Sequence, residues 1–466
     1  MEARPTLRAE LRQLVLLGAP LAITQVGQTL LGAVDVAVLG RAGAELLGGA
    51  GLGNALYFGI GILGMGAMHG LDPLVSQALG GGDADRARRL VWQGLWLALL
   101  LAMVLAAPIA LSPRLLAPLG IAPAVIEQAE RYLAIRVLGL PLLFLYFAPR
   151  ALLLAQNRLQ AMLVAVALAN VLNLGLDVLL VFGGAGLPAW TGPLRAIPPL
   201  GVAGAAWASN AASALQVVVL ALVVRAELRG LPRTGGRSAA APDRRDLALA
   251  LRVGVPAGLH MCAEVNFFAV LGSAVGGRLG TIPLAAHQVA LQLASLTFTW
   301  IVGIGNAGAV RVGLAVGARD RAGARRAGVA ALVGATAFMA AAALAFLFFP
   351  GPIAGLMTDD PAVRAAAVPL LRIAAAFQLF DGLQGVAAGI LRGAGDTRFT
   401  FAVNMVAYWA VGLPVVIVLA FGLRWGIAGQ WTGFVVSLAI VAALLVPRFL
   451  RLSARDIRPL GDPAGA

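Results

Sequence analysis

The chain has 466 residues, of which 60% are hydrophobic and only 12% are charged, and its mean hydropathy is +0.89. These values exclude a water-soluble globular protein, because no soluble core of this size could bury so much apolar surface. The net charge of +14 would suit a nucleic-acid-binding protein, but the placement of the charges indicates a membrane protein instead.

Apolar stretches long enough to cross a bilayer follow one another along the whole chain. A spanning helix needs about 20 mostly apolar residues. Clusters of arginine, glycine and proline separate twelve predicted spans, at residues 14–40, 52–79, 91–111, 131–154, 160–182, 201–224, 247–276, 284–316, 327–349, 365–391, 400–421 and 427–449. The expected fold class is therefore an all-α polytopic membrane protein with twelve transmembrane helices.

All 35 basic residues are arginines, a usage that indicates a GC-rich prokaryotic genome. If the N-terminus is cytoplasmic, 26 arginines lie on cytoplasmic segments and nine lie on the other side, with Arg41, Arg114 and Arg136 among the nine. This asymmetry follows the positive-inside rule. We expect a multi-pass protein of the bacterial plasma (inner) membrane, with both termini cytoplasmic, the lipid bilayer as partner and no nucleic-acid partner.

The chain also repeats itself at an offset of about 237 residues. The segment GGGDADRARR at 80–89 matches GARDRAGARR at 317–326, and two shorter blocks agree in the same register. We predict an N-terminal six-helix bundle at 1–225, a cytoplasmic linker at 226–246, and a C-terminal six-helix bundle at 247–466. With an even number of spans per half, the bundles are related by a pseudo-twofold axis along the membrane normal, which places a substrate site between them.

Four carboxylates lie inside predicted spans, namely Asp35, Asp177, Glu264 and Asp381. An ionisable group at bilayer depth costs roughly 2.5–3.5 kcal/mol even on a lenient scale, so such groups are functional candidates by default. The repeat aligns each of them with a residue that carries no charge. The shared architecture therefore does not require these carboxylates, which favours a functional role over a structural one.

Several segments resemble the multidrug and toxic compound extrusion (MATE) family, and in particular its NorM branch. The resemblance covers nearly the whole chain and is carried by PLAITQVGQTLLGAVDVAVLGRAG, GLDPLVSQALGGGD, NVLNLGLDVLLVFG, GVPAGLHMCAEVNFFAVL, LAAHQVALQ and LRIAAAFQLFDGLQGVAAGILRGAGDTR. It implies two six-helix bundles (the MATE fold), alternating access, and export of organic cations in exchange for Na⁺ or H⁺.

In the C-terminal half, Glu264 and Asp381 match the acidic pair that this branch uses for cation coupling. Two carboxylates in a low-dielectric pocket suit a small cation, because their oxygens replace its hydration shell, and protons compete for the same oxygens. Both would be the Na⁺ ligands if Na⁺ is the coupling ion. Phe377 stands one turn before Asp381 and would either contact a cation or simply pack.

In the N-terminal half, Asp35 lies on the first helix, and Asn173 and Asp177 share one face of the fifth. The resemblance implies a proton-responsive or substrate-facing cluster here, whereas the structural alternative is an interhelical hydrogen bond of about 0.6 kcal/mol. These residues would couple ions or receive the drug. The predicted lining of the substrate cavity comprises Gln288, Phe377, Asn210 and Gln28.

Other polar residues leave alternatives open. Asp72 would either take part in coupling or join helices near the cytoplasmic end of its span, and His260, one turn before Glu264, would be able to relay protons. The pair Asp359-Asp360 would either attract cations or cap the helix that begins at Pro361, and capping is the stronger explanation. Pro20, Pro141, Pro256 and Pro414 are predicted helix-bending points.

The leading hypothesis is a secondary antiporter that exports lipophilic cationic amphiphiles, works as a monomer and needs no cofactor beyond the coupling ion, Na⁺ or H⁺. No nucleotide-binding motif is visible. One alternative is a flippase for a lipid-linked precursor, which would be expected to carry several basic residues in its cavity. A membrane-embedded enzyme is the other, but the spans contain no nucleophile-base pair or metal-ligand cluster, so we expect no catalysis.

Overall fold

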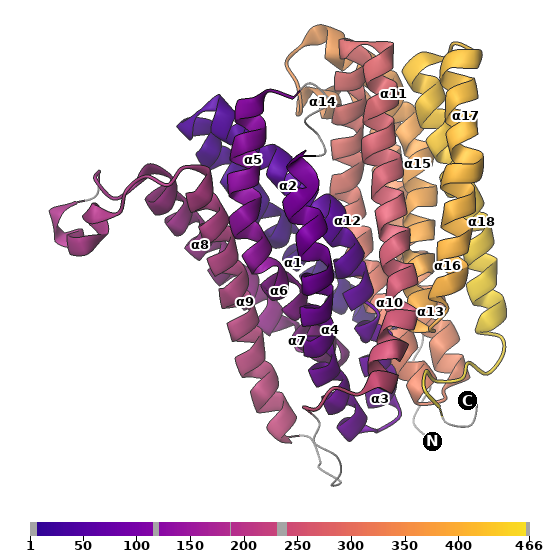
Figure 1. Cartoon of the computed structure of the whole chain (residues 1–466). Coiled ribbons are helices and arrows are strands. Elements are labelled where there is room, and N and C mark those ends of the chain that lie inside the picture. The colour runs from indigo at the N-terminus through magenta and orange to yellow at the C-terminus, as the bar shows by residue number, and fades with distance from the viewer. Residues whose placement is uncertain (1–6, 115–120, 187, 231–239, 463–466) are drawn as a thin grey trace. The chain divides into compact units, whose positions relative to one another are not determined.

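The computed structural model of the chain describes residues 7–114, 121–186, 188–230 and 240–462 (Figure 1). All regular secondary structure in these ranges is helical. Part of the predicted linker, residues 231–239, lies outside the described residues.

In its described residues, the first half of the chain forms, besides a 3₁₀ turn at 112–114, nine α-helices and two 3₁₀ helices. They are α1 (Leu7–Ala42), α2 (Ala44–Met68), α3 (Leu71–Gly80), α4 (Ala84–Leu111), α5 (Pro123–Arg136), η2 (Val137–Gly139), α6 (Leu140–Leu145), α7 (Phe147–Ala155), α8 (Leu159–Phe182), η3 (Ala189–Ala196) and α9 (Val202–Gly230).

The second half consists of α-helices interrupted by three π-helical stretches, η4, η5 and η6. The elements are α10 (Arg244–Val265), η4 (Asn266–Leu271), α11 (Gly272–Leu279), α12 (Thr281–Gly317), α13 (Arg321–Phe348), α14 (Pro350–Gly355), α15 (Pro361–Gly393), α16 (Thr397–Asn404), η5 (Met405–Gly412), α17 (Leu413–Ile417), η6 (Val418–Gly422) and α18 (Gly426–Leu452).

Within the described residues, twelve continuous or interrupted helices are long and apolar enough to cross a membrane, which confirms the predicted fold class. Two of them begin eight residues before their predicted starts. The second begins at Ala44 instead of residue 52. The fourth runs from Pro123 to Ala155 instead of 131–154, because α5 starts at a proline that suits the first turn of a helix. Arg136, which we had assigned to the outer side, therefore lies near the middle of a spanning segment.

The contacts divide the chain into two compact units. One consists of residues 1–22, 72–82 and 252–466, and the other of residues 23–71 and 83–251. We call them the C-terminal unit and the N-terminal unit. The second half of the chain thus packs with the start of α1 and with all but the first residue of α3. The predicted domain boundaries at 225 and 247 were drawn from the sequence repeat and stay a prediction.

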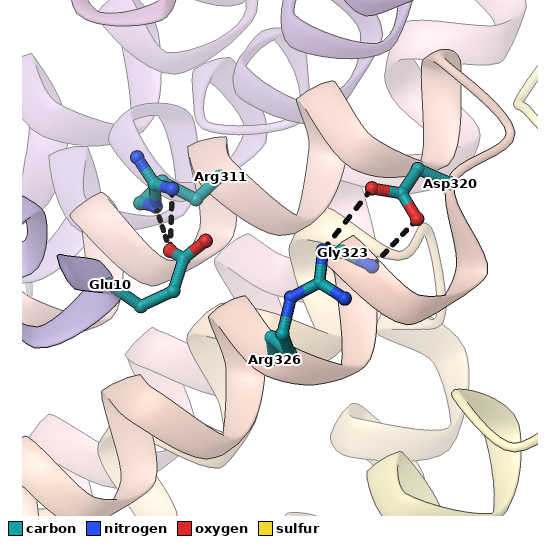
Figure 2. A network of polar contacts seen from close by, with 5 residues as sticks. All are labelled: Glu10, Arg311, Asp320, Gly323 and Arg326. Atoms are coloured by element: carbon teal, nitrogen blue, oxygen red, sulfur yellow. Dashed lines mark hydrogen bonds and ion pairs between the residues drawn. The ribbon is translucent and has the colours of Figure 1, made fainter. Parts of the chain in front are cut away.

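An ion pair holds the start of α1 inside the C-terminal unit. Glu10 is almost fully buried, and its Oε2 accepts hydrogen bonds from Nε of Arg311 on α12, at 3.0 Å, and from Nη2 of the same side chain (Figure 2). In the same unit Asp320 accepts a hydrogen bond from the Gly323 amide and lies 3.6 Å from Arg326 Nη2 (Figure 2). Breaking a buried pair on one side leaves an unpaired charge, so Glu10 fixes the beginning of α1 on α12.

Two glycines allow α3 to cross α12 at backbone contact. A Cβ on Gly80 would collide with the Leu314 carbonyl oxygen, and a Cβ on Gly317 would collide with the Gln77 carbonyl oxygen. The offset of the sequence repeat relates Gly80 to Gly317 and Gln77 to Leu314, so the two contacts are reciprocal. Such close crossings are typical of small residues at helix interfaces in membranes.

Three aspartates cap the helices that follow them. Asp83 and Asp320, which the repeat pairs, are N-caps whose carboxylates accept from the amides of Arg86 and Gly323, each at 2.8 Å. Asp360 likewise caps α15 and accepts from two amides of its first turn. The capping explanation of Asp360 is confirmed.

Prolines accompany several changes of helix type. Pro20 and Pro256 lie inside α1 and α10. Pro141 follows the 3₁₀ turn η2, and Pro414 follows the π-helical stretch η5. A further π-helical stretch, η4, begins two residues after Glu264. Such interruptions frequently occur at functional sites, because they redirect side chains that a regular helix would place elsewhere.

Candidate functional site

Each unit contains one cluster of buried carboxylates. The C-terminal cluster is built by Glu264 on α10 and by Asp381 and Gln384, one turn apart on α15. Asp381 and Gln384 are buried, and the Glu264 side chain is 14% exposed. The structure thus brings together the two C-terminal acids that the sequence predicts as a pair.

An amide that the sequence analysis did not single out joins these two acids. The Nε2 group of Gln384 donates to Glu264 Oε1 at 2.7 Å and to Asp381 Oδ1 at 3.2 Å. A primary amide has two N–H donors, so one side chain can hold two carboxylates that would otherwise repel each other. The i+3 spacing from Asp381 was the available signal for Gln384.

Two further groups border the C-terminal cluster. His260 Nε2 lies 3.4 Å from Glu264 Oε2, which makes an ion pair when the imidazole is protonated. The Tyr408 ring stacks on Phe267. The Tyr408 hydroxyl has no hydrogen-bond partner among the described residues, and it interacts electrostatically with Glu264 and Asp381. The Tyr408 hydroxyl is therefore able to form a hydrogen bond with a further group beside the two carboxylates.

No group of three or more His, Cys, Asp or Glu side chains suited to a metal ion occurs in the described part of the chain. A Na⁺ ion at the C-terminal cluster would rely on two carboxylates and on neutral oxygens. The side-chain oxygen of Gln384 and the hydroxyl of Tyr408 are buried and without partners among the described residues. This donor set is chemically suitable for Na⁺, and Glu264 and Asp381 as its ligands stay a prediction.

Phe377 lies in an aromatic cluster next to the acids. Its ring centroid is 5.3 Å from that of Trp431 and 5.4 Å from that of Phe268, to which it is edge-on. The structure shows the packing role that we considered, and contact with a cation stays a prediction. Gln288 is exposed and donates to Ser273 Oγ at 2.9 Å, so its amide is available at the surface of this unit.

The N-terminal cluster combines three predicted residues and one that was missed. Asp35 Oδ1 accepts from Asn173 Nδ2 at 3.1 Å, and Asp35 Oδ2 accepts from Ser209 Oγ of α9 at 2.7 Å. All three side chains are buried. Ser209 was overlooked because a hydroxyl in an apolar helix commonly bonds to its own backbone and carries no distinct signal.

Asp177 completes the N-terminal cluster. The side chain is fully buried and interacts with Asp35 electrostatically and through a side-chain hydrogen bond that needs a proton on one of the two acids, and its oxygens accept no hydrogen bond from any other described residue. Burial of an ionised carboxylate without partners is costly, and a proton or a cationic ligand offsets that cost. Asp177 is thus the group in this unit that is best placed to exchange a proton or cation.

Two predicted cavity residues have other partners in the N-terminal unit. Asn210 accepts at Oδ1 from Arg136 Nη1, 2.8 Å away, and donates to the Ile135 carbonyl. Gln28 donates to Gln216 Oε1 at 3.0 Å and is partly exposed. Neither contacts Asp35 or Asp177 by a hydrogen bond in the described structure, and a cavity-lining role for both stays a prediction.

Arg136 itself is the third functional candidate that sequence reasoning missed, after Gln384 and Ser209. It is buried, its guanidinium lies 4.4 Å from the centroid of the Tyr57 ring, and it interacts electrostatically with Asp35 and Tyr132. The signal was present as an arginine inside an apolar run. The prediction that the fourth span begins at 131 placed this residue near the outer end of that span and so concealed its depth.

The comparisons with known proteins agree over nearly the whole chain. The MatE family model matches residues 20–179 and 256–418, one segment in each half of the predicted repeat. A probable multidrug resistance protein NorM of Rhizobium meliloti is 36% identical over 449 residues, covering 94% of this chain and 93% of the relative. The multidrug resistance protein PmpM of Pseudomonas aeruginosa is 33% identical, with 97% and 94% covered.

Solved structures show the same fold at low sequence identity. A MATE protein in its bent conformation superposes with a TM-score of 0.84 at 20% identity, covering 96% of this chain and 98% of that one. A MOP superfamily transporter of Pyrococcus furiosus, described as having a binding pocket of reverse polarity, gives 0.82 at 20% identity, with 96% of each chain covered. The fold thus accommodates pockets of different polarity, and the polarity of this chain must be read from its own residues.

Proposed function

The chain belongs to the MatE family of membrane transporters, and from this premise we propose that it is a multidrug efflux antiporter that exports lipophilic organic cations in exchange for Na⁺ or H⁺. The observation that carries the proposal is the pair of buried carboxylate clusters, one in each compact unit. Relatives named as multidrug resistance proteins over nearly the same length support the choice of substrate class.

The C-terminal cluster is proposed as the principal site of ion coupling. Glu264 and Asp381 supply negative charge, and Gln384 keeps their oxygens close together. A proton or Na⁺ that binds there neutralises part of this charge. The ion can drive transport only if it binds the two conformations of the transporter with different affinity, because equal affinity shifts no equilibrium.

The N-terminal cluster is proposed to respond to protons or to the cationic substrate. Asp35 is fixed by two hydrogen bonds from neutral side chains, whereas Asp177 is buried and, among the described residues, is hydrogen-bonded to Asp35 alone. A cation or proton that reaches Asp177 removes an unfavourable buried charge, and its departure restores it. Because of this difference, a proton or cation is expected to bind and leave at Asp177 more readily than at Asp35.

The charges in the two clusters favour cation export over a lipid-precursor flippase. A pyrophosphate-bearing lipid requires several basic groups in the binding region. Among these buried site residues only Arg136 is permanently basic, and it interacts with Asp35 and is hydrogen-bonded to Asn210. The acidic groups outnumber it, so an anionic substrate would meet net repulsion.

We further propose that the protein acts as a monomer in the bacterial inner membrane, with both termini in the cytoplasm. The bias of arginines toward one side of the predicted spans supports this orientation.

The proposal is tested by efflux of a fluorescent lipophilic cation in inverted membrane vesicles, with Na⁺ and pH gradients imposed separately. The four variants are Glu264→Gln, Asp381→Asn, Asp35→Asn and Asp177→Asn. We expect gradient-driven transport without ATP, and its loss in Glu264→Gln and Asp381→Asn. Undiminished transport in all four variants would contradict the mechanism, and transport driven only by ATP would contradict the class.

A further inference from the structure

The N-terminal cluster contains a permanently charged arginine, Arg136, whereas the C-terminal cluster, in the described structure, has no arginine bonded to its acids. We propose that Arg136 is a specificity-determining residue: it gives the N-terminal cluster a fixed positive charge, so that this cluster exchanges a proton and rejects metal cations such as Na⁺. The inference rests on the proposed function, because it assigns the ion at one of the two acidic sites.

The guanidinium of Arg136 is held in a fixed position. Its Nη1 donates to Asn210 Oδ1 at 2.8 Å, and its Cζ lies over the Tyr57 ring at 4.4 Å. Asn210 can approach so closely because Gly139 has no side chain, since a Cβ there would collide with the Asn210 amide. Arginine stays charged in proteins, so this charge is present in every protonation state of the cluster.

Charged and titratable groups converge on this region from four helices. They are Asp35 of α1, Tyr57 of α2, Tyr132 and Arg136 of α5, and Asp177 of α8. Arg136 is hydrogen-bonded to Asn210, and the preceding residue, Ser209, is hydrogen-bonded to Asp35, so the arginine is joined to the aspartates through adjacent residues of one helix, and electrostatic interactions connect the remaining groups. The fifth helix, α9, adds the neutral side chains of Ser209 and Asn210. With one proton shared by the two aspartates and with neutral tyrosines, the total charge is zero.

A metal cation has less to gain at this cluster than a proton has. Na⁺ needs several free oxygens, but both oxygens of Asp35 already accept hydrogen bonds, from Asn173 and Ser209. It would also lie near a fixed positive charge. A proton needs only one oxygen, and Asp177 and Asp35 can share it, because their side chains are hydrogen-bonded to each other when one of them is protonated. In the C-terminal cluster no arginine is hydrogen-bonded or ion-paired to Glu264, Asp381 or Gln384 in the described structure.

The test measures ²²Na⁺ binding to the purified full-length protein carrying Glu264→Gln and Asp381→Asn, which leaves only the N-terminal cluster intact. We expect no saturable Na⁺ binding by this parent. Adding Arg136→Gln should give saturable Na⁺ binding, with a Kd at least about tenfold below the highest Na⁺ concentration at which the parent fails to saturate, a change of at least about 1.4 kcal/mol, and a further Asp35→Asn should abolish it. Arg136→Lys keeps the charge and should bind no better than the parent.

The matched control is Arg131→Gln, because Arg131 lies on the same helix but is exposed and paired with Glu127. It should leave Na⁺ binding unchanged. Saturable Na⁺ binding by the parent that Asp35→Asn removes would overturn the proposal, and this result does not depend on whether Arg136→Gln folds. Folded Arg136→Gln protein without any gain would overturn it as well. Transport is not measured, so failure of the antiporter function would be seen separately in vesicles.

Discussion

Single residues decide how each cluster holds its charge. In the C-terminal cluster one amide, Gln384, donates to both acids, so the relative position of Glu264 and Asp381 depends on it. In the N-terminal cluster, Ser209 and Asn173 each donate to a different oxygen of Asp35. These neutral donors are positioning residues, because they orient the charged groups without carrying charge themselves.

Replacing Gln384 by leucine should lower gradient-driven efflux about tenfold, because a hydrogen bond to a charged group is worth about 1.5–3 kcal/mol. Binding of the substrate, measured by fluorescence in the absence of a gradient, should change less than the efflux rate, since Gln384 orients the ion site. The control is Gln378→Leu on the same helix, whose amide donates to Thr297 Oγ1 instead. Equal losses of efflux in both variants would assign Gln384 a merely structural role.

Replacing Ser209 by alanine should destabilise the protein by about 1.5–3 kcal/mol, because the hydroxyl donates to the Asp35 carboxylate at 2.7 Å and a hydrogen bond to a charged group contributes about that much. The midpoint of thermal unfolding in detergent should therefore be lower in the variant than in the parent. Ser213→Ala, which removes a hydroxyl bonded to the Ser209 carbonyl, is the control and should lower the midpoint less. Equal losses in both variants would contradict a special contribution of the bond to Asp35.

At the scale of helices, the reciprocal glycine contacts determine how closely α3 and α12 cross. Gly80→Ala and Gly317→Ala each introduce a Cβ into a backbone carbonyl and should lower stability by about 1–3 kcal/mol. Gly175→Ala on α8 meets no atom within 4 Å and should raise stability by up to about 1 kcal/mol, because alanine is the better helix former. Thermal unfolding midpoints of the three purified variants check the opposite signs. A stabilising Gly80→Ala would contradict the close crossing.

At the scale of the whole molecule, the apolar runs of the sequence correctly predict the number of membrane-spanning segments and their approximate positions. Length and hydropathy are sufficient for that, because every spanning segment must satisfy its own backbone hydrogen bonds. The intramembrane acids were equally predictable, since charge in an apolar run is rare. The packing of residues 7–22 with the second half was not, because such a contact depends on tertiary structure and leaves no periodic signal.

The details of the site were less predictable for physical reasons. Ser209 and Gln384 are neutral, so their presence in a helix costs little and attracts no notice. The hydrogen-bond partner of Asn210 depends on how three helices are rotated about their axes, and sequence periodicity alone does not specify that rotation. In the structure this partner is Arg136. The depth of Arg136 was hidden because the predicted start of its span, residue 131, lies eight residues after the observed start, Pro123.

The central claim, that substrate and ion move in opposite directions through one carrier, is tested by ion flux in proteoliposomes of the purified protein. Addition of a lipophilic cation on one side, with no ion gradient imposed, should drive H⁺ or ²²Na⁺ across the membrane in the opposite direction. The combined Glu264→Gln and Asp381→Asn protein should show no ²²Na⁺ flux, because it keeps only the N-terminal cluster, which is proposed to exchange protons and to reject Na⁺. Substrate movement without any counterflow of H⁺ or Na⁺, or ²²Na⁺ counterflow that survives both substitutions, would contradict the account.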